Sequence, residues 1–234
     1  LGQTLADEAY ADLVTRLKAA GYDVASAEEM KAAATFAALP AYSGPNAIGG
    51  AGTSGKIVYG PRSGVLLRGY GFEQGLAAMT PATLIGLGKA SAELNAVMLT
   101  PRLLIDFARM ESSGRSNWTA NASVGAELRF RINEASRADY VAANERAGSM
   151  PGGWSLKSGA GTDELFGVMT EADDRSDSVA LHNAFAAAGL GSIYRQSLIY
   201  DVTISQARYA ALARAAYQGF NAALVEQIKA AKAP

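Results

Sequence analysis

The chain has 234 residues and a formal net charge of −1, from 21 basic and 22 acidic residues. It contains no cysteine, which excludes disulfide bonds and thiolate metal sites, and its one histidine, His182, excludes a multi-histidine metal site within one chain. The balanced charge gives no global attraction to nucleic acid or to an anionic membrane surface. Neither is predicted as a partner, and no cofactor or metal is predicted.

The amino-terminal quarter predicts two helices. Apolar residues at helical spacing run from Leu5 to Leu17, with Thr4 resembling a helix cap and Gly21 placed to end the helix in the left-handed conformation. A short strand is predicted over 22–25. Ser26 with Glu29 then forms a capping-box pattern for a second helix, which is expected to stop before Pro40.

The rest of the chain alternates between strand-like and helix-like segments. Strands are predicted at 56–59, 65–68, 96–110, 124–133, 138–142, 165–169 and 198–204. Helices are predicted from Pro81 towards Glu93, from a cap at Asp177 or Ser178 to Gly189, and from Ser205 to near the carboxyl terminus. Pro101 cannot donate to a strand ladder, so it must lie at an edge, a bulge or a break. Residues 133–136 are expected to form a turn that connects the strand over 124–133 to the strand over 138–142.

Because strands and helices are interspersed, the chain predicts an α/β (or α+β) fold. We expect a mixed β-sheet covered by helices, with a long C-terminal helix packed on the sheet. The chain 1–234 is predicted to be a single domain with Gly-rich loops at about 41–55 and 146–163.

One Gly-rich stretch has the spacing of a phosphate-binding loop. Gly50, Gly52, Gly55 and Lys56 would direct backbone N–H groups and a lysine at phosphates. Such a loop needs a buried strand before it and a helix after it, whereas here a loop precedes and a strand follows. A flexible connector is therefore favoured. Phosphate binding remains the alternative.

That alternative is a hydrolase or nucleotide-binding enzyme whose site is assembled from distant residues. It requires Lys56, His182 and carboxylates such as Asp106 and Asp173 to meet in one pocket. His182 lies among apolar neighbours on a predicted helix, and no GxSxG sequence accompanies it, which favours a structural role. The sequence therefore predicts a noncatalytic protein.

Partner binding is predicted at aromatic residues in or beside Gly-rich segments, namely Tyr59, Tyr70, Phe72 and Trp154. A second, basic patch is formed by Arg129, Arg131 and Arg137, which would suit a lipid headgroup, a polysaccharide or an acidic partner surface. Glu127 on the same face partly cancels this charge. A solvated strand edge is therefore favoured for the arginines.

The amino-terminal segment resembles a recurring opening in bacterial envelope proteins. A helix ends in Leu17-Lys18-Ala19-Ala20-Gly21-Tyr22-Asp23-Val24, and a strand and a second helix capped by Ser26-Ala27-Glu28-Glu29 follow. Over about residues 5–37 this is similar to the α/β domains of curli-secretion-type lipoproteins and to the amino-terminal domain of the Tol-system propeller protein. The resemblance implies a noncatalytic envelope component that acts by assembly with other proteins. It carries over no catalytic residues.

The start of the sequence also bears on export. It begins with Leu1 in place of methionine, which a removed signal peptide or a lost lipid anchor would explain, and the removal of a disordered terminus would explain it equally well. No apolar stretch reaches the roughly 18 to 20 residues of a membrane span. We therefore expect a lipoprotein-like protein of the periplasm or outer envelope, which binds itself, a partner protein or an envelope polymer.

Overall fold

The structure is a computed structural model. It describes residues 1–41, 47–49, 57–67, 81–106, 109–113, 123–142, 152–156, 160–171 and 200–232. The chain forms two compact units. Unit 1 comprises Leu1–Leu104, Ile132–Ala160 and Ala210–Pro234, and unit 2 comprises Ile105–Arg131 and Gly161–Tyr209. The single domain over 1–234 stays a prediction.

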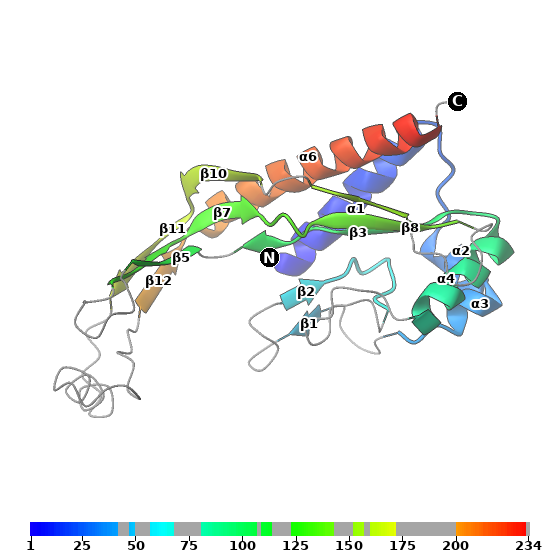
Figure 1. Cartoon of the computed structure of the whole chain (residues 1–234), viewed down its shortest axis with the longest axis horizontal. Helices are drawn as coiled ribbons and strands as arrows, with labels where there is room; N and C mark the ends of the chain where they lie inside the picture. Colours follow the sequence, from blue (N-terminus) through cyan, green and yellow to red (C-terminus); the bar gives the residue numbers. More distant parts are fainter. Residues whose placement is uncertain are drawn as a thin grey trace. The chain divides into compact units, whose positions relative to one another are not determined.

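The described residues form helices and small sheets (Figure 1). The helices are α1 (Gly2–Ala19), α2 (Ala27–Ala32), α3 (Ala34–Ala37), α4 (Pro81–Leu94) and α6 (Gln206–Lys232). The strands are β1 (Ala47–Gly49), β2 (Ile57–Tyr59), β3 (Met98–Arg102), β4 (Ile105–Asp106), β5 (Arg109–Ser113), β6 (Ser123–Glu127), β7 (Arg129–Ile132), β8 (Arg137–Val141), β9 (Gly152–Ser155), β10 (Ala160–Leu165), β11 (Gly167–Glu171) and β12 (Tyr200–Ile204).

The predicted α/β class and the long C-terminal helix on the sheets are confirmed. The strand orders are β1-β2, β3-β8-β9, β5-β6, β10-β7-β4 and β11-β12. The pairs β1–β2, β3–β8, β8–β9, β5–β6 and β11–β12 are antiparallel. The sheet structure is thus divided among several small sheets, where one sheet was expected.

Helix α1 ends as its sequence predicts but begins earlier. Gly21 has a φ of 81°. The Gly21 N–H donates to the Lys18 carbonyl and the Tyr22 N–H to the Leu17 carbonyl, both at 3.0 Å, which is the Schellman arrangement. The prediction of Thr4 as a cap is wrong, because the helix starts at Gly2 with Leu1 at the cap position.

The predicted strand over 22–25 does not form, because no described strand lies beside it to complete a ladder. The capping box is confirmed: the Ser26 N–H donates to Glu29 Oε2 at 2.6 Å and the Glu29 N–H to Ser26 Oγ at 3.1 Å. The second helix is interrupted at Ala33, whose backbone is extended (φ −69°, ψ 121°). A separate short helix, α3, follows.

Several strand predictions also need correction. Within 65–67, only Leu67 pairs, in an isolated bridge to Ala41. The expected loop over 146–163 contains β9 and the start of β10. The 133–136 turn forms, but β7 and β8 belong to different sheets and make no hairpin. Pro101 lies on β3 at the edge of its sheet, as predicted.

In unit 1, the β3-β8-β9 sheet has an apolar cluster on each face. Leu99, Ala138 and Trp154 pack against α1 and α6, whose buried contributions are Leu13, Phe220, Leu224 and Val225. Successive strand residues point to opposite faces, so Met98 and Val141 pack on the other side. There they meet Phe36, Leu39, Leu87 and Ala90 from the α3–α4 region. Figure 1 shows α1 alongside α6 in this unit.

Unit 2 is organised around an aromatic cluster. The Tyr209 ring makes edge contacts with Phe130 and Phe166, with ring centroids 5.7 and 5.1 Å apart. The Phe166 N–H donates to the Leu128 carbonyl, and the Ser205 N–H donates to the Phe166 carbonyl. Ser205 also caps α6, because its Oγ accepts from the Arg208 N–H at 3.3 Å, as the sequence predicts.

Candidate functional site

The best-defined candidate surface in unit 1 lies on β2. Ile57 and Tyr59 are two positions apart on one strand and therefore share a face. The exposed fraction is 60% for Ile57 and 42% for Tyr59, although both side chains are large and apolar or aromatic. We call these two residues the β2 surface. Exposed apolar side chains that cluster are typical of interaction sites, whereas isolated ones are ordinary.

The first turns of α1 hold the segment that follows β2. Gln3 Nε2 donates to the Gly60 carbonyl at 2.8 Å, and the Arg62 N–H donates to Asp7 Oδ1 at 2.7 Å. The Arg62 guanidinium also lies 3.5 Å from Asp7 Oδ2. These contacts fix the backbone of the turn, so the β2 surface is presented on an anchored segment.

Gly2 permits a close approach between α1 and Tyr59. A Cβ at Gly2 would lie 2.4 Å from Tyr59 Cε2, closer than atoms can approach. The Tyr59 ring therefore lies against the backbone at the start of α1, while the residue as a whole is still 42% exposed. The sequence identified Tyr59 by its place beside a Gly-rich segment, but it missed Ile57, because burial cannot be read from a three-residue strand.

Trp154 has a different environment. It is half-buried, and its ring lies 5.2 Å from that of Phe220 in the cluster between the sheet and α6. The structure therefore places Tyr59 against α1 and Trp154 against α6, and it does not bring them together in one contact. The other predicted residues lie outside the described residues: Tyr70, Phe72, Gly50, Gly52, Gly55, Lys56, His182 and Asp173.

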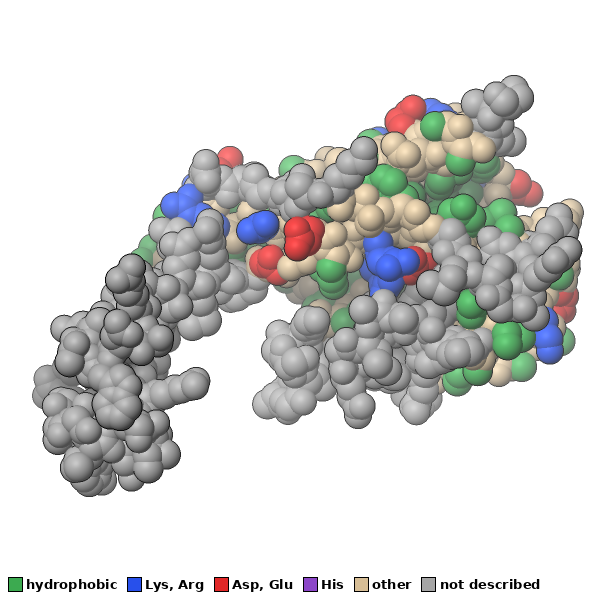
Figure 2. Space-filling model, in the orientation of Figure 1, with side chains coloured by type: hydrophobic (Ala, Val, Ile, Leu, Met, Phe, Trp, Pro, Cys, Tyr) green, Lys and Arg blue, Asp and Glu red, His purple; other side chains and the backbone are tan. Residues whose placement is uncertain are grey.

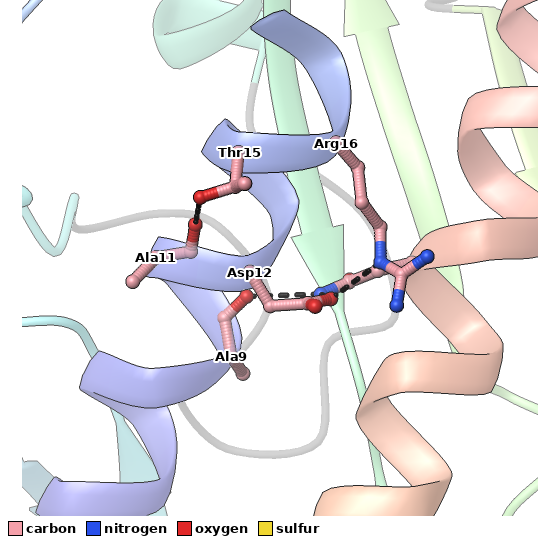
Figure 3. A network of polar contacts seen from close by, with 6 residues as sticks. Ala9, Ala11, Asp12, Thr15 and Arg16 are labelled. Atoms are coloured by element: carbon pink, nitrogen blue, oxygen red, sulfur yellow. Dashed lines mark hydrogen bonds and ion pairs between the residues drawn. The ribbon is translucent and has the colours of Figure 1, made fainter. Parts of the chain in front are cut away.

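A polar seam joins α1 to α6 (Figure 3). The Asp12 carboxylate accepts from Arg16 Nε at 2.8 Å and from Asn221 Nδ2 at 3.0 Å. The hydrogen bond to Asp12 raises the pKa of Arg16. Asn221, which is buried, also donates to the Ala9 carbonyl at 2.9 Å. Both contacts are donated by the buried Nδ2 group of Asn221, so this polar seam fixes how the two helices meet.

A second charged cluster lies on the β3-β8-β9 sheet. The Asp139 carboxylate, 3% exposed, accepts from Arg102 Nη2 at 2.7 Å through Oδ2 and from Arg137 Nε at 2.7 Å through Oδ1. Figure 2 shows basic and acidic side chains next to one another near the position where Figure 1 draws β3 and β8. Arg129 and Arg131 lie on β7, in another sheet, so the predicted three-arginine patch is not built on one strand pair.

The carboxylates with altered pKa values have structural partners. The Glu93 carboxylate accepts hydrogen bonds from the Thr35 hydroxyl, from the Ala34 N–H at 2.8 Å and from the Thr35 N–H at 2.9 Å. These hydrogen bonds, that of the Thr35 hydroxyl first, lower the pKa of Glu93. The Ser26 N–H lowers the pKa of Glu29 in the capping box. In both cases the carboxylate stabilises the start of a helix, where it complements the helix dipole.

Within the described ranges, no three His, Asp or Glu side chains gather closely enough to hold a metal ion. None of the described helices combines the length and apolarity needed to cross a membrane. Comparison of the chain with protein-family models, curated proteins and solved structures gives no significant match.

Proposed function

We propose that this chain is a noncatalytic binding protein of the bacterial envelope that contacts its partner through the β2 surface. The observation that carries the binding role is the exposure of Ile57 and Tyr59 on one face of an anchored strand. A rigid backbone supports binding because little conformational entropy is lost on association. The envelope location rests on the resemblance of residues 5–37, and the partner is a protein or an envelope polymer.

The noncatalytic role is supported by the structural contacts of three glutamates whose pKa values are lowered. Glu29 and Glu93 cap helices, and Glu8 pairs with Arg214 across two helices. Each of these lowered pKa values has a cause in helix capping or helix pairing. A general acid or base would instead have a pKa moved towards neutrality.

Site-specific photo-crosslinking tests the binding surface. Benzoylphenylalanine is placed at Ile57 in the full chain, and at Val97 in a control, because Val97 is exposed to the same fraction of 60%. We expect one discrete crosslinked product from position 57 in intact cells, lost when Tyr59→Ala is added, and no such product from position 97. Equal products from both positions would contradict the assignment of the surface.

Thermal-shift measurements test the noncatalytic role. A ligand that binds only the folded state raises its melting temperature. We expect ATP with magnesium to leave the melting temperature of the full chain unchanged. A rise of several degrees would favour the nucleotide-binding alternative, and cell fractionation that leaves the protein in the cytosol would contradict the envelope location.

A further inference from the structure

The two-stranded β11–β12 sheet of unit 2 exposes β-branched side chains on both of its faces. Val202 and Ile204 are two positions apart on β12 and share one face, and they are 47% and 36% exposed. Val168 on β11 is 61% exposed and lies opposite Thr203, which places it on the other face. A two-stranded sheet is only marginally stable in water, so a further strand would stabilise it.

Strand β12 has an open outer edge. Within the described part of the chain, β12 pairs with β11 alone. The Ser205 N–H donates to the Phe166 carbonyl at 2.8 Å, which continues the β11–β12 register by one residue. Because the backbone groups of successive strand residues point to alternate edges, those of Thr203 also point at β11. The N–H and C=O groups of Val202 and Ile204 therefore point away from β11, along the outer edge.

The sequence of β12 suits antiparallel pairing with a second copy of the same strand. When the pairing is centred on Val202, this residue lies opposite its counterpart, and Asp201 lies opposite Thr203 of the second copy. All five residues of the strand, Tyr200–Ile204, are then paired. The outward backbone groups of the two strands meet in hydrogen-bonded pairs, because each strand presents those of its even-numbered residues.

Neither neighbouring centre fits as well. Asp201 is the one charged residue of β12. A pairing centred on Asp201 would set two carboxylates directly opposite each other, which is destabilising. A pairing centred on Thr203 would set the first residues of β12 against Ser205 and the start of α6, where the strand has ended. The distribution of charge and the length of the strand thus favour Val202 as the centre.

We propose that β12 pairs antiparallel with β12 of a second copy of this chain, in a symmetric dimer centred on Val202. The contact joins two two-stranded sheets into one of four strands and closes on itself, so it does not lead to a filament. It also covers an exposed strand edge, which is otherwise a template for unspecific pairing. This surface is separate from the β2 surface and does not depend on the proposed function.

The cysteine-free sequence permits a disulfide test of the full chain. Cα atoms of directly opposite, hydrogen-bonded residues are about 5.5 Å apart, within the range of roughly 4.4 to 6.8 Å that a disulfide spans. Val202→Cys should therefore form a disulfide-linked dimer under mild oxidation. Val168→Cys is the matched control, because it makes the same substitution at a more exposed valine of the inner strand. It should remain monomeric, and equal crosslinking of both variants would contradict the register.

Molar mass measured by light scattering at increasing concentration tests the dimer without crosslinking. The mass of the unmodified chain should double. Val202→Lys, which places two like charges at the centre of the contact, should stay monomeric, whereas Val168→Lys should dimerise as the unmodified chain does. Persistence of the dimer in a folded Val202→Lys would overturn the proposal. So would a monomeric mass of the unmodified chain up to about 1 mM, which would leave a strand of another protein as the occupant of the edge.

Discussion

Arg214 donates from Nε and Nη2 to the two carboxylate oxygens of Glu8, at 2.8 and 2.9 Å, and so joins helices at opposite ends of the chain. The guanidinium lowers the pKa of Glu8, and the carboxylate raises that of Arg214. The Tyr217 hydroxyl donates to Glu8 at 3.4 Å, and burial raises the pKa of Tyr217. This pair, with the Asp12–Asn221 contact one turn further along α1, sets the register of α1 against α6.

A double-mutant cycle on this pair should show coupling. We expect Glu8→Gln and Arg214→Gln each to lower the melting temperature, because each leaves its former partner without a bidentate contact. The double variant should lose less than the sum of the two single losses. Strictly additive losses, measured by thermal unfolding at low salt, would mean that the two side chains do not interact in solution.

The cap that Glu93 provides to α3 predicts a pH dependence. The pKa of Glu93 lies below its ordinary value of 4.5 in the folded protein, so its contribution to stability is complete above that value. The contribution is lost as the pH falls through the lower, folded-state pKa. We therefore expect Glu93→Gln to be less stable than the unmodified protein at pH 7, with the difference shrinking in acid.

Urea unfolding at several pH values measures this difference. Glu28→Gln is the control, because Glu28 is an acidic residue in the first turn of the neighbouring helix α2, whose capping box is formed by Ser26 and Glu29 instead. Its stability should follow that of the unmodified protein across the acid range. A Glu93→Gln difference that stays constant from neutral pH to pH 3 would contradict the capping role of the charge.

A substitution at Phe220 tests how much the apolar cluster between α6 and the sheet contributes to stability. It is 4% exposed and contacts the Trp154 ring. Phe220→Ala should lower the free energy of unfolding by about 3 kcal/mol, because it removes buried surface and leaves a cavity. Gln227→Ala, at an exposed position of the same helix, should change it by less than about 0.5 kcal/mol.

Tryptophan fluorescence reports the same change locally. In a Trp118→Phe background, which leaves Trp154 as the single tryptophan, Phe220→Ala should shift the emission to longer wavelength as water reaches the ring. An unchanged spectrum together with a loss below about 1 kcal/mol would place Phe220 outside the core.

Two glycines should respond in opposite directions to replacement by alanine. A Cβ at Gly167 would lie 2.5 Å from the Thr203 carbonyl oxygen and 2.7 Å from Leu128 Cδ1, so Gly167→Ala must disturb the β11–β12 pair. Gly219 lies within α6 with open space around its Cα. Gly219→Ala should therefore stabilise the protein by about 0.5 to 1 kcal/mol.

Thermal unfolding distinguishes these two outcomes. Gly167→Ala should lower the melting temperature and Gly219→Ala should raise it. If Gly219→Ala is also destabilising, then the surface of α6 at this position is covered in solution.

Features that depend on neighbouring residues were determined by the sequence. The Ser26–Glu29 capping box, the Gly21 helix end and the Ser205 cap each join groups within one turn of helix, so the residue types and their spacing suffice. The exclusion of Pro101 from a central strand likewise follows from its missing N–H.

The tertiary structure alone decided which distant segments meet. Glu93 caps a helix 58 positions away, at Thr35, and Arg214 reaches Glu8 across 206 positions, and no local pattern marks either pair. The same holds for strand pairing: the sequence predicts both β7 and β8 as strands joined by a turn, yet they belong to different sheets. An alternating pattern specifies a strand and its two faces but carries no information on the partner, because any strand edge offers the same backbone donors and acceptors.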